Sequence, residues 1–224
     1  MKVRLVACSQ PVNMIGIDNV QDLIAYCARV SNPSNQLNTE TAEKLIRYLI
    51  KHKHWSPLEM ASATLEIETT RDIARQILRH RSFSFQEFSQ RYADPNDLDN
   101  TFVIREARLQ DPKNRQNSID GASENIKKAW AAKQQQIIHE AKIAYKWAID
   151  NGIAKEQARV VLPEGNTVSR LYMNGTLRSW VHYIELRSEN GTQREHMEVA
   201  WEVGRAIATI FPLANELTKE VLHG

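Results

Sequence analysis

Cysteine and glycine are both scarce in this chain of 224 residues. Cys8 and Cys27 are the only cysteines, so the chain has no disulfide framework and no cysteine spacing typical of metal ligands. We therefore assign no metal site and expect a reducing, cytoplasmic setting. The 8 glycines include no Gly-x-Gly-x-x-Gly fingerprint, which argues against a dinucleotide held in a Rossmann fold.

Long apolar runs and a strong charge of one sign are also missing. No stretch approaches the roughly 18 apolar residues of a membrane span, and the apolar part of the opening MKVRLVACSQPVN is too short for a signal peptide. The net charge is only +2, so the chain as a whole is not a strongly basic nucleic-acid binder. We expect neither a membrane nor a nucleic acid as partner, and any site for a polyanion must be a local concentration of charge.

The hydrophobic pattern predicts an α+β fold in which long helices pack on a small, mostly antiparallel sheet. With 42% hydrophobic residues, the chain suits one domain over residues 1–224. Strands are expected over 3–7 and 64–68, residues 81–92 as irregular or extended chain, and 94–100 as a polar loop. Helices are expected over 19–30, from Thr39 or Thr41 to about residue 51, and over 70–80, 121–150, 154–161 and 192–210. The buried side of the long helix is predicted to carry Ala122, Ile126, Trp130, Ile137, Ala141, Ala144 and Ala148.

The local concentration of charge lies in Arg71–Arg91, which holds five arginines, one histidine and two acids. Guanidinium groups are planar, forked donors that match phosphate and carboxylate oxygens. Arg79, His80 and Arg81 follow an apolar helical pattern, and a junction between a helix and a strand would let them fan around one polyanion. The alternative is a solvated basic patch with scattered ion pairs.

Glu87, Ser89 and Arg91 stand at alternate positions. In an extended chain these three side chains would point to the same face. An acceptor, a hydroxyl and a cation together suit a ligand with a phosphate and hydrogen-bonding edges.

The sequence Arg79–Arg91, RHRSFSFQEFSQR, resembles the signature of flavin-dependent thymidylate synthases. That signature has an Arg-His-Arg triplet, a serine-rich stretch and then Glu-x-Ser-x-Arg; Gln86 stands where asparagine is frequent. Further matching blocks follow the family's order: Ala28–Ser31, His54–Pro57 with Glu59, Ala158–Pro163, Gly175–Ser179, Leu186–Arg187 and Thr192–Glu195.

The resemblance implies a role for each matching residue. FAD would be contacted by Ser31, Ser56, Arg79, His80, Arg81, Glu87, Arg178 and His182. The substrate dUMP would be held by Gln76, Glu87, Ser89, Arg91, Arg159 and Arg187. The catalytic candidates are His54, Ser89 and Arg187, although nothing in the sequence provides a base beside Ser89, and we favour a binding role for it. His182 and Thr176 stand where other members carry other residues, so their hydrogen bonds can differ.

The activity implied by this resemblance is reductive methylation of dUMP to dTMP. Methylenetetrahydrofolate would supply the carbon, NADPH the electrons through FAD, and a homotetramer would hold each site at a subunit interface. Neither Cys8 nor Cys27 has an electropositive, exposed setting that favours a thiolate nucleophile, which agrees with a flavin route.

Several alternatives stay open from the sequence. The chain could act on a different pyrimidine nucleotide, or Arg71–Arg91 with its phenylalanines could be a surface for single-stranded nucleic acid. His54 could serve a helix end, Ser89 a turn, and Arg159 and Arg187 structural ion pairs. His139, His196 and His223 show no shared spacing and receive no role.

Overall fold

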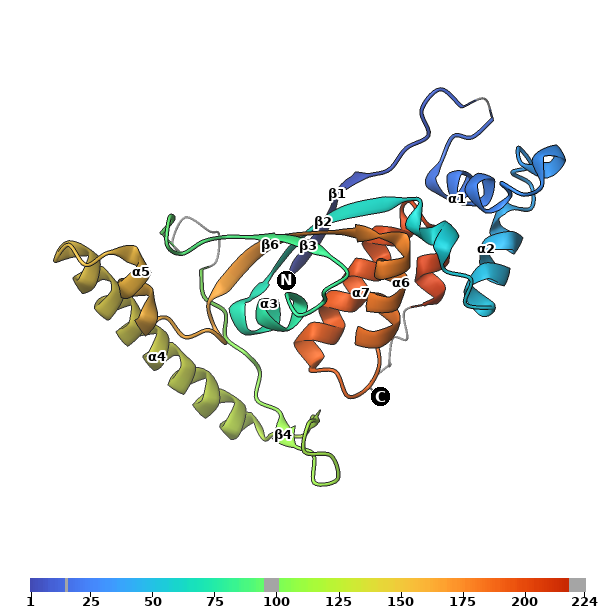
Figure 1. Cartoon of the computed structure of the whole chain (residues 1–224). Coiled ribbons are helices and arrows are strands. Elements are labelled where there is room, and N and C mark those ends of the chain that lie inside the picture. The colour runs from blue at the N-terminus through green and yellow to red at the C-terminus, as the bar shows by residue number, and fades with distance from the viewer. Residues whose placement is uncertain (15, 95–100, 218–224) are drawn as a thin grey trace.

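A four-stranded antiparallel sheet forms the centre of the protein. The computed structural model describes residues 1–14, 16–94 and 101–217 (Figure 1). The sheet consists of β1 (Lys2–Cys8), β2 (Ser62–Thr70), β6 (Val168–Thr176) and β3 (Ser84–Glu87), in the order β1-β2-β6-β3. Each neighbouring pair is antiparallel, which confirms the predicted α+β class and differs from the parallel Rossmann sheet. Most of the predicted loop 94–100, and His223, lie outside the described residues.

The two faces of the sheet differ in chemistry because side chains alternate along a strand. Leu65, Ile67, Leu171 and Met173 are fully buried on one face. The other face is polar: Glu66 accepts hydrogen bonds from Arg4 at 3.1 Å and from the Tyr172 hydroxyl at 2.8 Å, and Arg170 pairs with Glu68 at 3.1 Å. These cross-strand pairs strengthen the pairing of β1, β2 and β6.

Helices α3 (Arg71–Ile77), α6 (Leu177–Arg187) and α7 (Arg194–Ala208) belong to the same core as the buried strand residues (Figure 1). Thr176 caps α6 by accepting a hydrogen bond from the Ser179 backbone N–H at 3.3 Å. The indole of Trp180 is fully buried and donates to the Ala63 carbonyl at 3.1 Å. This bond ties α6 to β2.

Helices α1 (Val20–Ala28) and α2 (Ala42–Lys51), with the short helices η1 (Pro33–Asn35) and η2 (Ser56–Glu59), form one end of the molecule. Asn19 caps α1 by accepting from the Asp22 N–H at 2.9 Å. Two backbone bonds end α2: Lys53 N–H donates to Ile50 at 3.1 Å and His54 N–H to Leu49 at 2.8 Å. This is a Schellman motif, with Lys53 in the left-handed region at φ 58°.

Helix α4 (Glu124–Asp150) projects from the opposite end, with α5 (Lys155–Ala158) and η4 (Arg159–Val161) beside it (Figure 1). Tyr145, Ala148, Ala158 and Leu162 form a small apolar cluster there, separate from the main core. A two-stranded hairpin, β4 (Leu109–Gln110) and β5 (Ser118–Ile119), and the short helix η5 (Pro212–Glu216) complete the elements described.

The predicted buried side of α4 is wrong at three positions. Ala122, Ala141 and Ala148 are buried, but Ile126, Trp130 and Ile137 are 50%, 46% and 52% exposed. These three side chains share one face of the helix because they follow at intervals of four and seven residues. The periodicity identified an apolar face, but within the part of the chain that the structure describes about half of each of these three side chains stays exposed.

Candidate functional site

Arg79, His80 and Arg81 occupy the connection between α3 and β3, as the sequence predicted. Helix α3 ends at Ile77, and the chain turns through Arg79–Phe83 before β3 begins at Ser84. The guanidinium-bearing residues Arg79 and Arg81 are exposed. In the part of the chain that the structure describes, neither has an acidic partner. Two guanidinium groups of this kind on one anchored turn suit an anionic ligand.

Phe83 anchors this turn on the sheet. Its ring packs against Trp180 with the ring centroids 4.7 Å apart, and against Tyr183 at 6.1 Å. A Cβ atom on Gly175 of β6 would lie 2.4 Å from the Phe83 ring. Glycine is therefore required at residue 175, because any side chain there would push the ring and the turn away.

His80 points inward, towards Arg187 at the end of α6. The Arg187 Nε–H donates to His80 Nε2 at 2.9 Å. Arginine is always a donor, so His80 must be neutral and protonated on Nδ1. Burial, together with the positive charge of Arg187, lowers the pKa of His80 to about 4. The pair is thus one fixed cation beside a neutral imidazole.

Gln76 and His196 complete this interior group. His196 is fully buried on α7, and its Nδ1 lies 3.2 Å from Gln76 Oε1. The Tyr183 hydroxyl lies 3.1 Å from His196 Nε2. Sequence reasoning assigned no role to His196 or Tyr183, since neither shows a spacing or a charge pattern of its own.

Glu87 is turned towards the sheet and α3. It accepts from the Ser169 hydroxyl at 2.8 Å and lies 3.7 Å from the Arg71 guanidinium and 4.0 Å from that of Arg75. Burial lowers the pKa of Arg71, with Glu87 opposing that effect. These contacts fix the end of β3 against α3.

Ser89 and Arg91 do not continue the extended chain, so the expected shared face of Glu87, Ser89 and Arg91 is wrong. β3 ends at Glu87, and Ser89 starts a turn in which its carbonyl accepts from Tyr92 N–H at 3.1 Å. The Ser89 hydroxyl accepts from the Arg91 N–H at 3.4 Å. A local hydrogen bond of this kind favours a turn over a strand.

Arg91 and Arg159 come together around Glu156. Arg91 forms an exposed ion pair with the Glu156 carboxylate at 3.4 Å, and Arg159 Nε donates to the Glu156 carbonyl at 3.3 Å. This pair of guanidinium groups is separate from the interior pair of Arg187 and His80. In one chain the arginines predicted to bind dUMP therefore form two groups by their contacts, Arg91 and Arg159 at Glu156 and Arg187 at His80.

His54, Ser56, Arg178 and His182 surround the short helix η2. The Trp55 and His182 rings pack edge to face with centroids 4.4 Å apart, and Arg178 pairs with Glu59. His54 is exposed and follows the end of α2, 6.0 Å from the Tyr48 ring. Aromatic edges next to a cation suit a planar, anionic ligand.

Ser31 lies apart from these groups. It is exposed and borders a cavity of about 510 Å³ between α1 and α2, together with Arg29 and Tyr48. Arg29 donates to the Thr41 hydroxyl at 2.8 Å and to the Asn38 carbonyl. These bonds hold the loop that carries Ser31.

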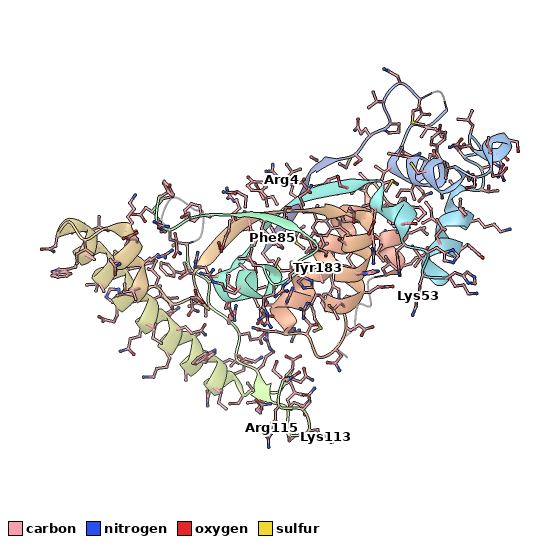
Figure 2. The ribbon with its side chains drawn as sticks, viewed as in Figure 1. Arg4, Lys53, Phe85, Lys113, Arg115 and Tyr183 are labelled. Atoms are coloured by element: carbon pink, nitrogen blue, oxygen red, sulfur yellow. The ribbon has the colours of Figure 1, made fainter. Side chains whose placement is uncertain are left out.

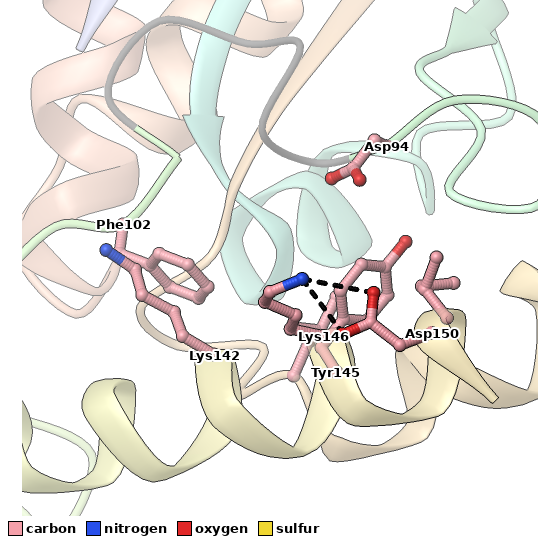
Figure 3. Close-up of a pocket in the computed structure, with 8 residues that line it drawn as sticks. Asp94, Phe102, Lys142, Tyr145, Lys146 and Asp150 are labelled. Atoms are coloured by element: carbon pink, nitrogen blue, oxygen red, sulfur yellow. Dashed lines mark hydrogen bonds and ion pairs between the residues drawn. The ribbon is translucent and has the colours of Figure 1, made fainter.

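A cavity of about 390 Å³ between α4 and Leu162 takes in none of the predicted site residues (Figure 3). Lys146 there pairs with Asp150 at 2.9 Å, and the Lys142 ammonium lies 5.2 Å from the Phe102 ring centroid. Its cations are thus already engaged, and we place the functional site at the residues around Arg79–Arg81 instead.

The fold and these residues define an α+β protein that gathers arginine, histidine and amide side chains beside an antiparallel sheet. That arrangement suits phosphorylated ligands with hydrogen-bonding edges, bound without a Rossmann fold.

Comparison with known proteins gives the family. Residues 14–213 match the family described as thymidylate synthase complementing protein. The chain is 50% identical over 200 residues to a probable flavin-dependent thymidylate synthase of Paramecium bursaria Chlorella virus 1, covering 89% of this chain and 90% of the relative. It is 46% identical over 214 residues to a flavin-dependent thymidylate synthase of Synechocystis sp., covering 95% and 96%.

Among solved structures, the chain resembles the UMP/dUMP methylase PolB from Streptomyces cacaoi bound with 5-Br dUMP. The TM-score is 0.80 at 28% identity, over 96% of this chain and 93% of the other. The chain belongs to the flavin-dependent thymidylate synthase family and is an enzyme of that class. Among the described residues, no helix is both long and apolar enough to cross a bilayer.

Proposed function

We propose that the enzyme methylates dUMP to dTMP, with methylenetetrahydrofolate as the one-carbon donor and NADPH as the reductant of a bound FAD. The observation that carries the proposal is the anchored turn Arg79–Arg81, with two exposed guanidinium groups lacking an acidic partner in the described chain, beside the neutral His80 held by Arg187. Family membership supplies the reaction class.

The residues fit FAD in their chemistry. Arg79 and Arg81 offer unpaired forked donors for a diphosphate, and Trp55 with His182 offers aromatic edges for a flat ring. Arg178, Ser56, His54 and Ser31 would add polar contacts. When bound, FAD supplies the redox chemistry that the protein's own side chains lack.

For dUMP, Arg91 and Arg159 are the residues we propose for the phosphate. Both groups have capacity to donate beyond their present contacts with Glu156, because a guanidinium carries five N–H donors. Ser89 and Glu87 would add hydrogen bonds to the nucleotide.

Arg187 and Gln76 are proposed to face the pyrimidine. Arg187 is held by His80, so its charge is fixed in place before any substrate binds. A preorganised cation stabilises negative charge that develops on the uracil carbonyl oxygens as carbon 5 attacks the one-carbon donor. Holding the reactants side by side supplies the proximity contribution.

The proposed active form is a homotetramer with sites at subunit interfaces. Two features support it: Ile126, Trp130 and Ile137 expose an apolar face of α4, and the arginines of one chain fall into two groups. Residues from a second copy would complete a pocket around both groups.

The activity test measures dTMP formed from dUMP, methylenetetrahydrofolate and NADPH by the purified protein, after recording its visible spectrum. A flavin spectrum and dTMP formation are expected. A colourless protein that binds single-stranded nucleic acid, or one that forms no dTMP with added FAD, would refute the proposal. Parallel assays with UMP test the alternative nucleotide, which the PolB likeness makes worth including.

The Arg79→Gln variant tests the turn itself. We expect FAD affinity to fall at least tenfold, since a charge-assisted contact contributes about 1.5–3 kcal/mol. Arg115→Gln is the matched control, because Arg115 is equally exposed but lies on the loop between β4 and β5 (Figure 2). Equal FAD affinity in both variants would remove Arg79 from the site.

The Ile137→Glu variant tests the assembly. An acid on the exposed apolar face is expected to shift the particle towards monomers in light scattering, with loss of activity. His139→Glu puts the same charge on another exposed face of α4 and should keep the wild-type mass. A wild-type protein that is active as a monomer would overturn the tetramer.

A further inference from the structure

A continuous row of hydrogen-bonding side chains runs from Arg108 to Tyr183. The Arg108 guanidinium lies 2.6 Å from Glu195 Oε1, and Gln193 Nε2 lies 3.0 Å from Glu195 Oε2. Gln76 Nε2 lies 2.8 Å from Gln193 Oε1. The row continues from Gln76 through His196 to the Tyr183 hydroxyl (Tyr183 is labelled in Figure 2). The side chains of the exposed turn Arg79–Arg81 take no part in this row.

The Arg108–Glu195 pair decides which group donates and which accepts at every hydrogen bond of the row. The side chains of Arg108 and Glu195 are only 16% and 14% exposed. Burial opposes ionisation of Glu195, but hydrogen bonds from Arg108, its own backbone N–H and Gln193 prevail and lower its pKa. An ionised carboxylate only accepts, so Gln193 must donate to it with Nε2.

The two amides then have one orientation each. With Nε2 of Gln193 directed at Glu195, its Oε1 faces Gln76, and Gln76 must donate with Nε2. That leaves Gln76 Oε1 facing His196 Nδ1, which must carry the proton. His196 Nε2 is then the acceptor for the Tyr183 hydroxyl. Each link has one possible donor once the carboxylate is fixed.

We infer that Tyr183, His196, Gln193, Glu195 and Arg108 are positioning residues that hold the amide of Gln76 in a single orientation, with His196 neutral and protonated on Nδ1. The inference deepens the proposed function, on which the role of Gln76 at dUMP rests. The amide of Gln76 has two N–H donors and two lone pairs, and the row uses one of each. A ligand therefore meets one fixed N–H donor and one fixed carbonyl acceptor on Gln76. A pyrimidine edge that offers an acceptor and a donor in the matching order is bound, and an edge with the two exchanged is not.

The first test reads the tautomer directly and needs no substrate. Protein labelled with ¹⁵N in its histidines is examined by two-bond ¹H–¹⁵N correlation spectra. His80 and His196 should be the two rings that keep neutral-ring shifts as the pH falls from about 8 to 5.5, because their buried pKa values lie well below the usual 6.5. Both should carry the proton on Nδ1, since Arg187 donates to His80 Nε2. A non-titrating ring protonated on Nε2 would overturn the inference.

The second test removes the group that sets the direction. In Glu195→Gln, Arg108 still donates to the amide oxygen, so the new Nε2 faces Gln193 and the donor-to-acceptor direction of the row reverses. We expect the KM for dUMP to rise about five- to tenfold, with kcat changed less, since one hydrogen bond contributes about 1 kcal/mol. The Nδ1–H signal of His196 should be replaced by an Nε2–H signal, because Gln76 would then donate to Nδ1. In Tyr183→Phe, by contrast, Nδ1–H should persist because the direction comes from the other end.

Glu198→Gln is the control for Glu195→Gln. Glu198 is on the same helix, pairs with Arg194 at 3.6 Å and takes no part in the row. Its KM for dUMP should stay at the wild-type value. An unchanged KM and an unchanged tautomer in Glu195→Gln would overturn the inference. If Glu195→Gln does not fold, the wild-type spectrum still tests the inference, because it reports which nitrogen of His196 carries the proton.

The two proposals fail in different ways. A wild-type protein that makes no dTMP refutes the proposed function, while the tautomer of His196 still tests the row. A wild-type protein that makes dTMP but holds His196 as the Nε2–H form refutes the row and leaves the function standing.

Discussion

Replacing the buried His196 should flatten the dependence of stability on pH. His196 is fully buried, and its pKa falls to about 3, first because of burial and then because of the charges of Arg187 and His80. In the unfolded chain its pKa returns to about 6.5. Between these two pKa values the imidazole is protonated in the unfolded chain and neutral in the folded protein, so acid favours unfolding.

The sign and the size follow from these two pKa values. The stabilisation by neutral His196 is fully present above about pH 6.5 and is lost as the pH falls towards 3. Each pH unit below 6.5 removes about 1.4 kcal/mol per histidine, so a fall to about pH 5 removes about 2 kcal/mol. His80, with a folded pKa of about 4, should remove a similar amount, for a total of about 4 kcal/mol.

Urea unfolding of wild type and His196→Asn at several pH values between about 7.5 and 5 measures the difference. Asparagine has no titrating group, so the variant should lose about 2 kcal/mol less than wild type over this range. All samples need the same protein concentration, because assembly adds to apparent stability. His139→Asn, at an exposed site on α4, should follow the wild-type curve. Parallel curves for wild type and His196→Asn would refute the burial of a neutral imidazole.

Three further substitutions test other parts of the structure. Gly175→Ala should lower the free energy of unfolding by about 2 kcal/mol and weaken FAD binding, since its Cβ would overlap the Phe83 ring. Thermal unfolding compares it with Gly165→Ala, where a Cβ meets nothing within 4 Å. Equal losses of stability in the two variants would contradict the prediction. Lys53→Gly should stabilise the protein by about 0.5–1 kcal/mol because φ is 58° there; a lower melting temperature would count against the Schellman motif. Ser89→Ala should keep turnover with a KM for dUMP raised about fivefold; complete loss of turnover with unchanged dUMP affinity would instead indicate a nucleophile.

Periodicity predicted the elements whose burial is one-sided. The helices over 19–30 and 192–210 correspond to α1 and α7, and the strand over 64–68 lies within β2. The same pattern did not reveal β6 or α6. In β6 an inward position is Gly175, where the Phe83 ring takes the place of a side chain. Helix α6 buries Leu177, Trp180, Val181 and Ile184 at the spacing i, i+3, i+4 and i+7, which is a regular apolar stripe. The sequence therefore carried a signal for this helix that the prediction did not use.

The residues of the candidate site could be named from the sequence, but their arrangement could not. The signature over Arg79–Arg91 identifies the turn, and its location between α3 and β3 follows from the helical pattern before it. The Gln76 amide contacts His196, which is 120 positions away in the sequence. Contacts of that kind arise from packing α7 against α3, and no local spacing encodes them.

The separate apolar cluster beneath α4 has a consequence for how the molecule opens. A helix fixed to its own chain through Tyr145, Ala148, Ala158 and Leu162 can detach without disturbing the strands. Its amide protons should exchange with solvent long before those of β2 and β6, in a cooperative unit of its own.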